Sequence, residues 1–126
     1  MQPQRFSIRR RTKSFYYAGK GIRQFLKTEH NARIHLVATV TVVAGALLLN
    51  ISRLEGVALA LAIGLVWVTE MLNTCLEKAM DLISLKQHPG IGFIKDLAAG
   101  AVLVASITAL VIGLIIFIPH IVSTFT

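Results

Sequence analysis

Residues 54–81 read LEGVALALAIGLVWVTEMLNTCLEKAMD, a stretch that is apolar at first and then carries acidic residues. Its apolar run, Leu54 to Leu76, is about long enough to cross a bilayer, because a spanning helix needs roughly 20 apolar residues. Similar runs lie on either side, Leu36 to Ile51 before it and Leu97 to Val122 after it. The sequence therefore predicts an all-α integral membrane protein with three transmembrane helices.

The composition of the whole chain agrees with this prediction. Of the 126 residues, 55% are hydrophobic and 15% are charged, which is too apolar for a water-soluble domain of this length. A single cysteine excludes an intrachain disulfide framework, and the four histidines lack the spacing of metal ligands. Disulfide-rich folds and structural metal folds are therefore excluded.

The positive charge is concentrated at the N-terminus. The net charge is +7, and nine of the 13 Lys and Arg residues precede position 34. No apolar core with a cleavage site stands in this part, so we do not expect a signal peptide. Basic residues occupy the other faces of this segment. Its apolar residues recur at intervals of three or four, at Phe15, Ala18, Ile22, Phe25 and Leu26. We expect an amphipathic helix on the membrane surface rather than a nucleic-acid-binding arm.

These features predict two regions. Residues 1–33 are expected to form the amphipathic surface helix region, and residues 34–126 the transmembrane domain. The spans are expected at about 34–51, 54–84 and 93–122.

The distribution of Lys and Arg predicts the orientation, because positive residues in short loops stay on the cytoplasmic side. The N-terminal arm and the loop at residues 81–96 are basic, whereas the turn at Arg53 and the tail after His120 are nearly bare. We expect the N-terminus inside and the C-terminus outside.

Two acids within the second span, Glu55 and Glu70, require an explanation, because a carboxylate inside a membrane costs about 2.5–3.5 kcal/mol. At about 100° per residue, Asn73, Glu77 and Asp81 lie within about 60° of Glu70 on the helix surface. Three acids and an amide on one face do not tolerate lipid. This stripe must therefore face protein, water or a metal.

Other ionisable residues reach the same membrane boundary, with Lys95 and Asp96 at the start of the third span and Glu29 before the first. Carboxylates for a divalent cation, a lysine for phosphate oxygens and a further carboxylate as base are the groups that phosphoryl transfer requires. Glu70 would be reached by a lipid alcohol, and Glu77 and Glu29 by a nucleotide with Mg²⁺.

A small proton-coupled transporter or channel subunit, with Glu70 as proton carrier, is the alternative. The spacing of the polar residues alone supports the transporter and the phosphotransferase about equally. A transporter needs a polar path to both sides, however, and residues 57–66 in the outer half of the second span contain no polar side chain. This observation favours the enzyme.

Two strings carry a resemblance to a known family. EMLNTCLE at residues 70–77, followed by Asp81, and KDLAAGAVL at residues 95–103 resemble the signatures of the small prokaryotic diacylglycerol kinase and undecaprenol kinase family. The resemblance implies a lipid kinase in the cell inner membrane of a prokaryote. It also implies a homotrimer with active sites shared between subunits, Mg-ATP as donor and a membrane lipid alcohol as acceptor.

The same resemblance implies roles for individual residues. Glu70 would bind the lipid hydroxyl and act as its general base, Asn73 would orient groups beside it, and Glu29 and Glu77 would hold the metal. The residues implied to contact the nucleotide are Arg10, Tyr17, Glu29, Glu77, Lys86, Gln87, His88, Lys95 and Asp96. The uniformly aliphatic lipid-facing surface does not distinguish diacylglycerol from undecaprenol as acceptor.

Overall fold

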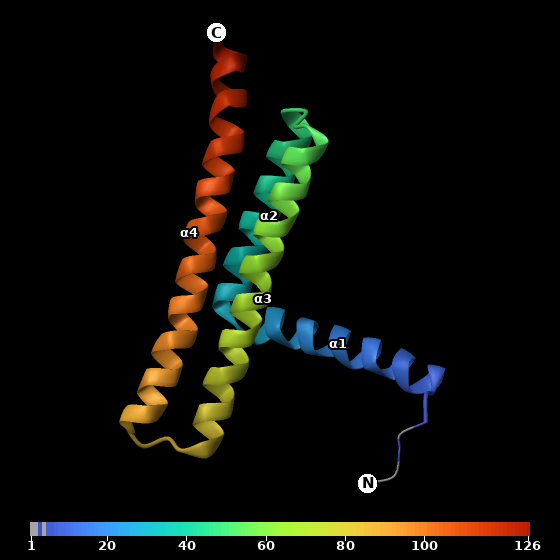
Figure 1. Ribbon diagram of the computed structural model, residues 1–126, viewed down its shortest axis with the longest axis vertical. Helices are drawn as coiled ribbons and strands as arrows, with labels where there is room; N and C mark the ends of the chain where they lie inside the picture. The colour runs from blue at the N-terminus through green and yellow to red at the C-terminus, as the bar shows by residue number, and fades with distance from the viewer. Residues whose placement is uncertain (1–2, 4) are drawn as a thin grey trace. The chain divides into compact units, whose positions relative to one another are not determined.

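The computed structural model describes residue 3 and residues 5–126. In this part of the chain all regular structure is helical, in the order α1 (Ile8–Thr28), α2 (His30–Leu48), α3 (Arg53–Ile83) and α4 (Pro89–Phe125) (Figure 1). The last three helices are each long and apolar enough to cross a membrane. The predicted all-α fold with three membrane spans is thus confirmed.

The chain divides into two compact units, with the division between Leu36 and Val37 in α2. The sequence places its own boundary slightly earlier, between residues 33 and 34.

In the first unit, α1 ends in a corner at Glu29. The backbone of Glu29 is extended, with φ −99° and ψ 121°, and its N–H donates to the Phe25 carbonyl at 3.0 Å. The Arg33 guanidinium donates from Nε to the Leu26 carbonyl at 3.3 Å and from Nη2 to the Lys27 carbonyl. These bonds satisfy carbonyl groups that have no partner within the last turn of a helix. Arg33 therefore stabilises the end of α1.

In the second unit, a tight turn joins α2 to α3. Asn50 has φ +50°, a left-handed conformation that asparagine adopts more readily than most residues. The Ser52 hydroxyl accepts from the Glu55 N–H at 3.2 Å, and the Glu55 carboxylate accepts from the Ser52 N–H at 3.3 Å. This capping box starts α3 at Arg53.

Helices α3 and α4 lie side by side and run antiparallel (Figure 1). A polar contact joins them near each end: Lys95 Nζ lies 2.6 Å from Asp81 Oδ1, and His120 Nε2 lies 2.8 Å from Glu55 Oε2. Glu55 and Asp81 are about 26 residues apart, which corresponds to about 39 Å along the helix. The two contacts thus bracket a length slightly greater than the ~30 Å hydrocarbon core of a bilayer.

Between these contacts the two helices bury mostly small or branched apolar side chains. The buried residues are Leu59, Ala62 and Val66 on α3, and Ala98, Ala105 and Ile116 on α4. Small side chains let membrane helices approach closely and gain van der Waals contact.

Helix α2 contacts both of the other helices in this unit. The indole Nε1 of Trp67 on α3 donates to Thr39 Oγ1 on α2 at 2.9 Å. Gly45 on α2 faces the Phe117 ring of α4, and a Cβ atom at Gly45 would lie 3.6 Å from Phe117 Cε1. Residues 37–126 therefore form one three-helix unit.

Candidate active site

Glu70 is the one buried polar or charged residue in the described part of the chain, with 3% of its surface exposed. The same number of residues separates Glu70 from Glu55 on α3 as separates Ala105 from His120 on α4. Because Glu55 contacts His120 and the helices are antiparallel, Glu70 lies at the level of buried Ala105.

Asn73 and Glu77 continue the same face of α3 by one and two turns. Asn73 Nδ2 donates to Glu77 Oε1 at 3.4 Å, so the two side chains share this face as the sequence predicts. Among the described residues, Asn73 Oδ1 is a buried side-chain oxygen that has no hydrogen-bond partner. An acceptor is therefore available between the buried carboxylate and the exposed one.

Exposure increases along this face, from buried Glu70 to exposed Glu77 and Asp81. A carboxylate buried within a span is shielded from water, whereas exposed carboxylates accommodate a hydrated cation. The face thus combines an environment for proton transfer with one for metal binding.

The loop between α3 and α4 lines an open cavity of about 540 Å³. Its lining includes four of the residues that the family resemblance implies to contact the nucleotide, namely Lys86, Gln87, His88 and Lys95. Asp96 follows Lys95 as an exposed residue on α4. The structure therefore brings two lysines and a histidine together around a space that suits an anion.

His88 also has a structural function in this loop. It is the N-cap of α4, and its Nδ1 accepts from the Gly90 N–H at 3.0 Å. Pro89 occupies the first helical position, where its missing N–H would have no intrahelical partner. A Cβ atom at Gly90 would lie 3.2 Å from the His88 ring, so glycine suits this close approach. With Nδ1 as acceptor, Nε2 is left to carry the ring proton.

Three further predicted site residues belong to the first unit. Arg10 and Tyr17 are exposed on α1, and Arg10 lines a hollow of about 620 Å³ together with Arg5 and Arg11. Glu29 is half-buried at the corner that follows α1.

The donor atoms of this region suit Mg²⁺. No group of three or more His, Cys, Asp or Glu side chains gathers as a metal site within the described residues. Mg²⁺ is commonly held by one or two carboxylates together with substrate phosphates and water, rather than by a cage of protein ligands. The Glu77 carboxylate and the free Asn73 Oδ1 are hard oxygen donors of the required kind.

Several polar contacts were not predicted from the sequence, among them the Ser52–Glu55 capping box and the pairs of Asp81 with Lys95 and of Glu55 with His120. Ser52 and Glu55 have the spacing of a capping box, Ser-x-x-Glu, and this signal was available. No sequence signal pairs Asp81 with Lys95 or His120 with Glu55, because the two residues of each pair lie on different helices.

Comparisons with known proteins point to a family. The profile of the prokaryotic diacylglycerol kinase family matches residues 16–117. Undecaprenol kinase of Bacillus subtilis (strain 168) is 40% identical over 115 residues, covering 91% of this chain and 94% of that protein. Diacylglycerol kinase of Synechocystis sp. is 39% identical over 111 residues, which cover 87% of this chain and 63% of that longer protein. Diacylglycerol kinase of Escherichia coli (strain K12) is 32% identical over 104 residues, covering 82% of this chain and 85% of that protein.

The three candidate spans and these matches define a multi-pass membrane protein of the lipid kinase class, which uses ATP to phosphorylate a lipid. The chain belongs to the prokaryotic diacylglycerol kinase family. The resemblance predicted from the two sequence strings is confirmed, and the transporter alternative is not supported.

Proposed function

We propose that this protein transfers the γ-phosphate of ATP to the hydroxyl group of undecaprenol, with Glu70 as the general base. The observation that supports this role is a carboxylate that is 3% exposed within a membrane-spanning helix. Glu70 accepts the hydroxyl proton while the lipid oxygen bonds to the γ-phosphorus. The bond from that phosphorus to the bridging oxygen breaks, and ADP leaves.

The residues around Glu70 have separate roles in this proposal. Asn73 orients groups beside the base, and Glu29 and Glu77 hold Mg²⁺. When bound, Mg²⁺ would neutralise charge on the phosphate oxygens. The nucleotide itself is contacted by Arg10, Tyr17, Lys86, Gln87, His88, Lys95 and Asp96. The loop cavity supports this assignment for the four of these residues that line it.

Undecaprenol is the preferred acceptor because the matched undecaprenol kinase aligns over nearly all of both chains. Diacylglycerol is the second candidate, since relatives that carry the diacylglycerol kinase name also match along most of this chain. In either case the hydroxyl group must reach the depth of Glu70 in the membrane.

The proposal extends to assembly and location. We expect a homotrimer whose active sites combine residues of neighbouring subunits. We place it in the inner membrane with the N-terminus in the cytoplasm, where ATP is present, and the basic N-terminal arm supports this orientation. Native mass spectrometry of the detergent-solubilised protein tests the trimer, and any other dominant mass would contradict it.

A side-by-side assay tests the function. Purified protein in mixed micelles receives Mg-ATP with undecaprenol, with diacylglycerol or with no lipid alcohol. We expect phosphate transfer only when an alcohol is present, with a higher kcat/KM for undecaprenol. A higher value for diacylglycerol would reverse the choice of acceptor, and consumption of ATP without any acceptor would contradict the proposed reaction.

A further inference from the structure

Asp81 and Lys95 form a close ion pair across the loop between α3 and α4. Lys95 Nζ donates to Asp81 Oδ1 at 2.6 Å. The Lys95 side chain is 36% exposed and the Asp81 side chain is 47% exposed. Asp81 lies near the end of α3, and Lys95 lies in the second turn of α4. Ion pairs as exposed as this one contribute little to stability, so stability alone does not account for this pair.

The two partners relate differently to the loop cavity. Lys95 lines the cavity together with Lys86 and His88. Asp81 is not among the described residues that line it. Lys95 therefore both lines the cavity and contacts the Asp81 carboxylate. A lysine has three N–H donors, so the bond to Asp81 leaves the others available to an anion in the cavity.

We propose that Asp81 is a positioning residue, which holds Lys95 in the orientation that binds the phosphate groups of ATP. This inference rests on the proposed role of Lys95 in nucleotide binding. A free lysine side chain loses substantial rotamer entropy when it binds a ligand, and an ion pair formed beforehand removes part of that loss. Protein kinases use related chemistry, because a glutamate on a neighbouring helix holds the lysine that contacts their phosphates.

The negative charge of Asp81 also repels a phosphate group, and this repulsion opposes the benefit of positioning Lys95. At a half-exposed site the repulsion is screened by water and salt. The contact with Lys95 is screened less, because its two charged groups lie only 2.6 Å apart. We therefore expect the positioning effect to dominate.

Steady-state kinetics of Asp81→Asn, Lys95→Met and the double variant test the inference, using the full chain in mixed micelles with Mg-ATP as the varied substrate. We expect Asp81→Asn to raise the KM for Mg-ATP roughly three- to tenfold. The KM for the lipid should not change. Lys95→Met should raise the KM for Mg-ATP at least as much, and Asp81→Asn should add nothing in the Lys95→Met background.

Glu55→Gln is the matched control. It removes a carboxylate from the same helix and breaks a contact of the same kind at the other end of the α3–α4 pair. Its KM for Mg-ATP should equal that of the unchanged protein. Asp81→Glu keeps the carboxylate, so its KM should fall between the values of the unchanged protein and Asp81→Asn. This variant also serves if Asp81→Asn does not fold.

The outcomes separate the inference from the function on which it rests. An unchanged KM in Asp81→Asn, or a full additional effect in the Lys95→Met background, would overturn the positioning role while leaving the kinase proposal intact. An unchanged KM in Lys95→Met would instead overturn the nucleotide role of Lys95 itself.

Discussion

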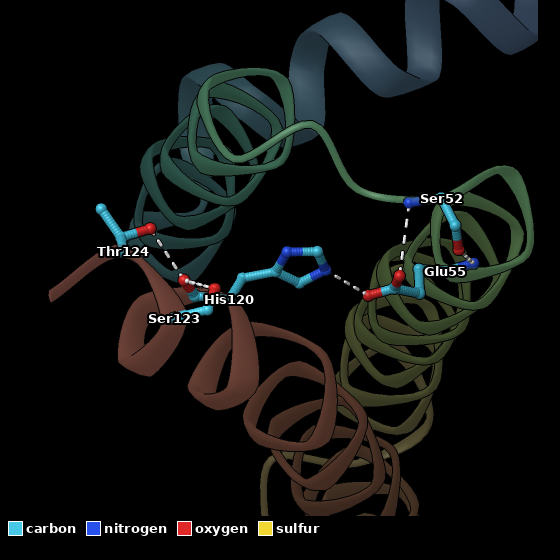
Figure 2. A network of polar contacts seen from close by, with 5 residues as sticks. All are labelled: Ser52, Glu55, His120, Ser123 and Thr124. Carbon is cyan, nitrogen blue, oxygen red and sulfur yellow. Dashed lines mark hydrogen bonds and ion pairs between the residues drawn. The ribbon is translucent and has the colours of Figure 1, made fainter. Parts of the chain in front are cut away.

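His120 Nε2 lies 2.8 Å from Glu55 Oε2, although the two residues are 65 positions apart in the sequence. Figure 2 shows the imidazole ring of His120 reaching from α4 toward Glu55 at the start of α3, where Ser52 contacts the same carboxylate. Glu55 thus caps its own helix through one oxygen and contacts α4 through the other. Glu55 is an acid within an otherwise apolar run. It therefore has a structural role, at the end of α3 opposite the candidate active site.

This contact predicts a loss of stability without a loss of chemistry. Glu55→Gln and His120→Ala should each lower the thermal unfolding temperature in detergent, because each removes one partner of a half-buried polar contact. The double variant should be little worse than the more damaging single variant, since both act on one contact. Full additivity of the two shifts, measured by differential scanning fluorimetry, would show that the residues act separately.

Replacing Glu70 by glutamine should remove the base without removing the fold. The amide has nearly the same shape but cannot accept a proton from the lipid hydroxyl. We expect kcat to fall by about 100- to 10,000-fold. Circular dichroism and the oligomeric mass should stay unchanged, and turnover near that of the unchanged protein would contradict the base assignment.

Glu77→Gln should affect the metal rather than the lipid. Loss of one carboxylate oxygen donor should raise the Mg²⁺ concentration for half-maximal activity by at least about tenfold. The KM for the lipid alcohol, measured at saturating Mg²⁺, should not change. If both parameters changed equally, the metal role of Glu77 would lose its support.

The two functions of His88 can be separated by choice of substitution. His88→Ala removes both the helix cap and the imidazole, whereas His88→Asn keeps an N-cap acceptor and removes only the imidazole. The alanine variant should lose about 0.5–1 kcal/mol of stability relative to the asparagine variant. Both variants should raise the KM for Mg-ATP if the imidazole contacts the nucleotide. A KM that rises only in His88→Ala would identify His88 as a cap alone.

The hydrogen bond between Trp67 and Thr39 predicts a measurable coupling between α2 and α3. In a double-mutant cycle of Trp67→Phe and Thr39→Val, we expect a coupling energy of about 0.6 kcal/mol, the average for such bonds in membrane proteins. Reversible unfolding in mixed micelles measures it. A value indistinguishable from zero would mean that packing alone joins these helices.

The sequence by itself determined the helical class, the three candidate spans and the face that carries Glu70, Asn73 and Glu77. These features follow from local rules, because bilayer thickness sets the length of an apolar run and the helical repeat places residues three, four and seven apart on one face. The hydrogen bond from Asn73 to Glu77 confirms that face over one turn. The family resemblance also rested on contiguous strings of residues.

Only the tertiary structure decided which groups pair across helices. Glu55 with His120, Thr39 with Trp67 and Asp81 with Lys95 are separated by 65, 28 and 14 positions. No local repeat relates such positions, since the pairing depends on how α2, α3 and α4 pack and on the turns that join them. The burial of Glu70 has the same origin, because other parts of the fold must cover it. A periodic pattern fixes the face on which a side chain lies, but the packing of other helices against that face decides its environment.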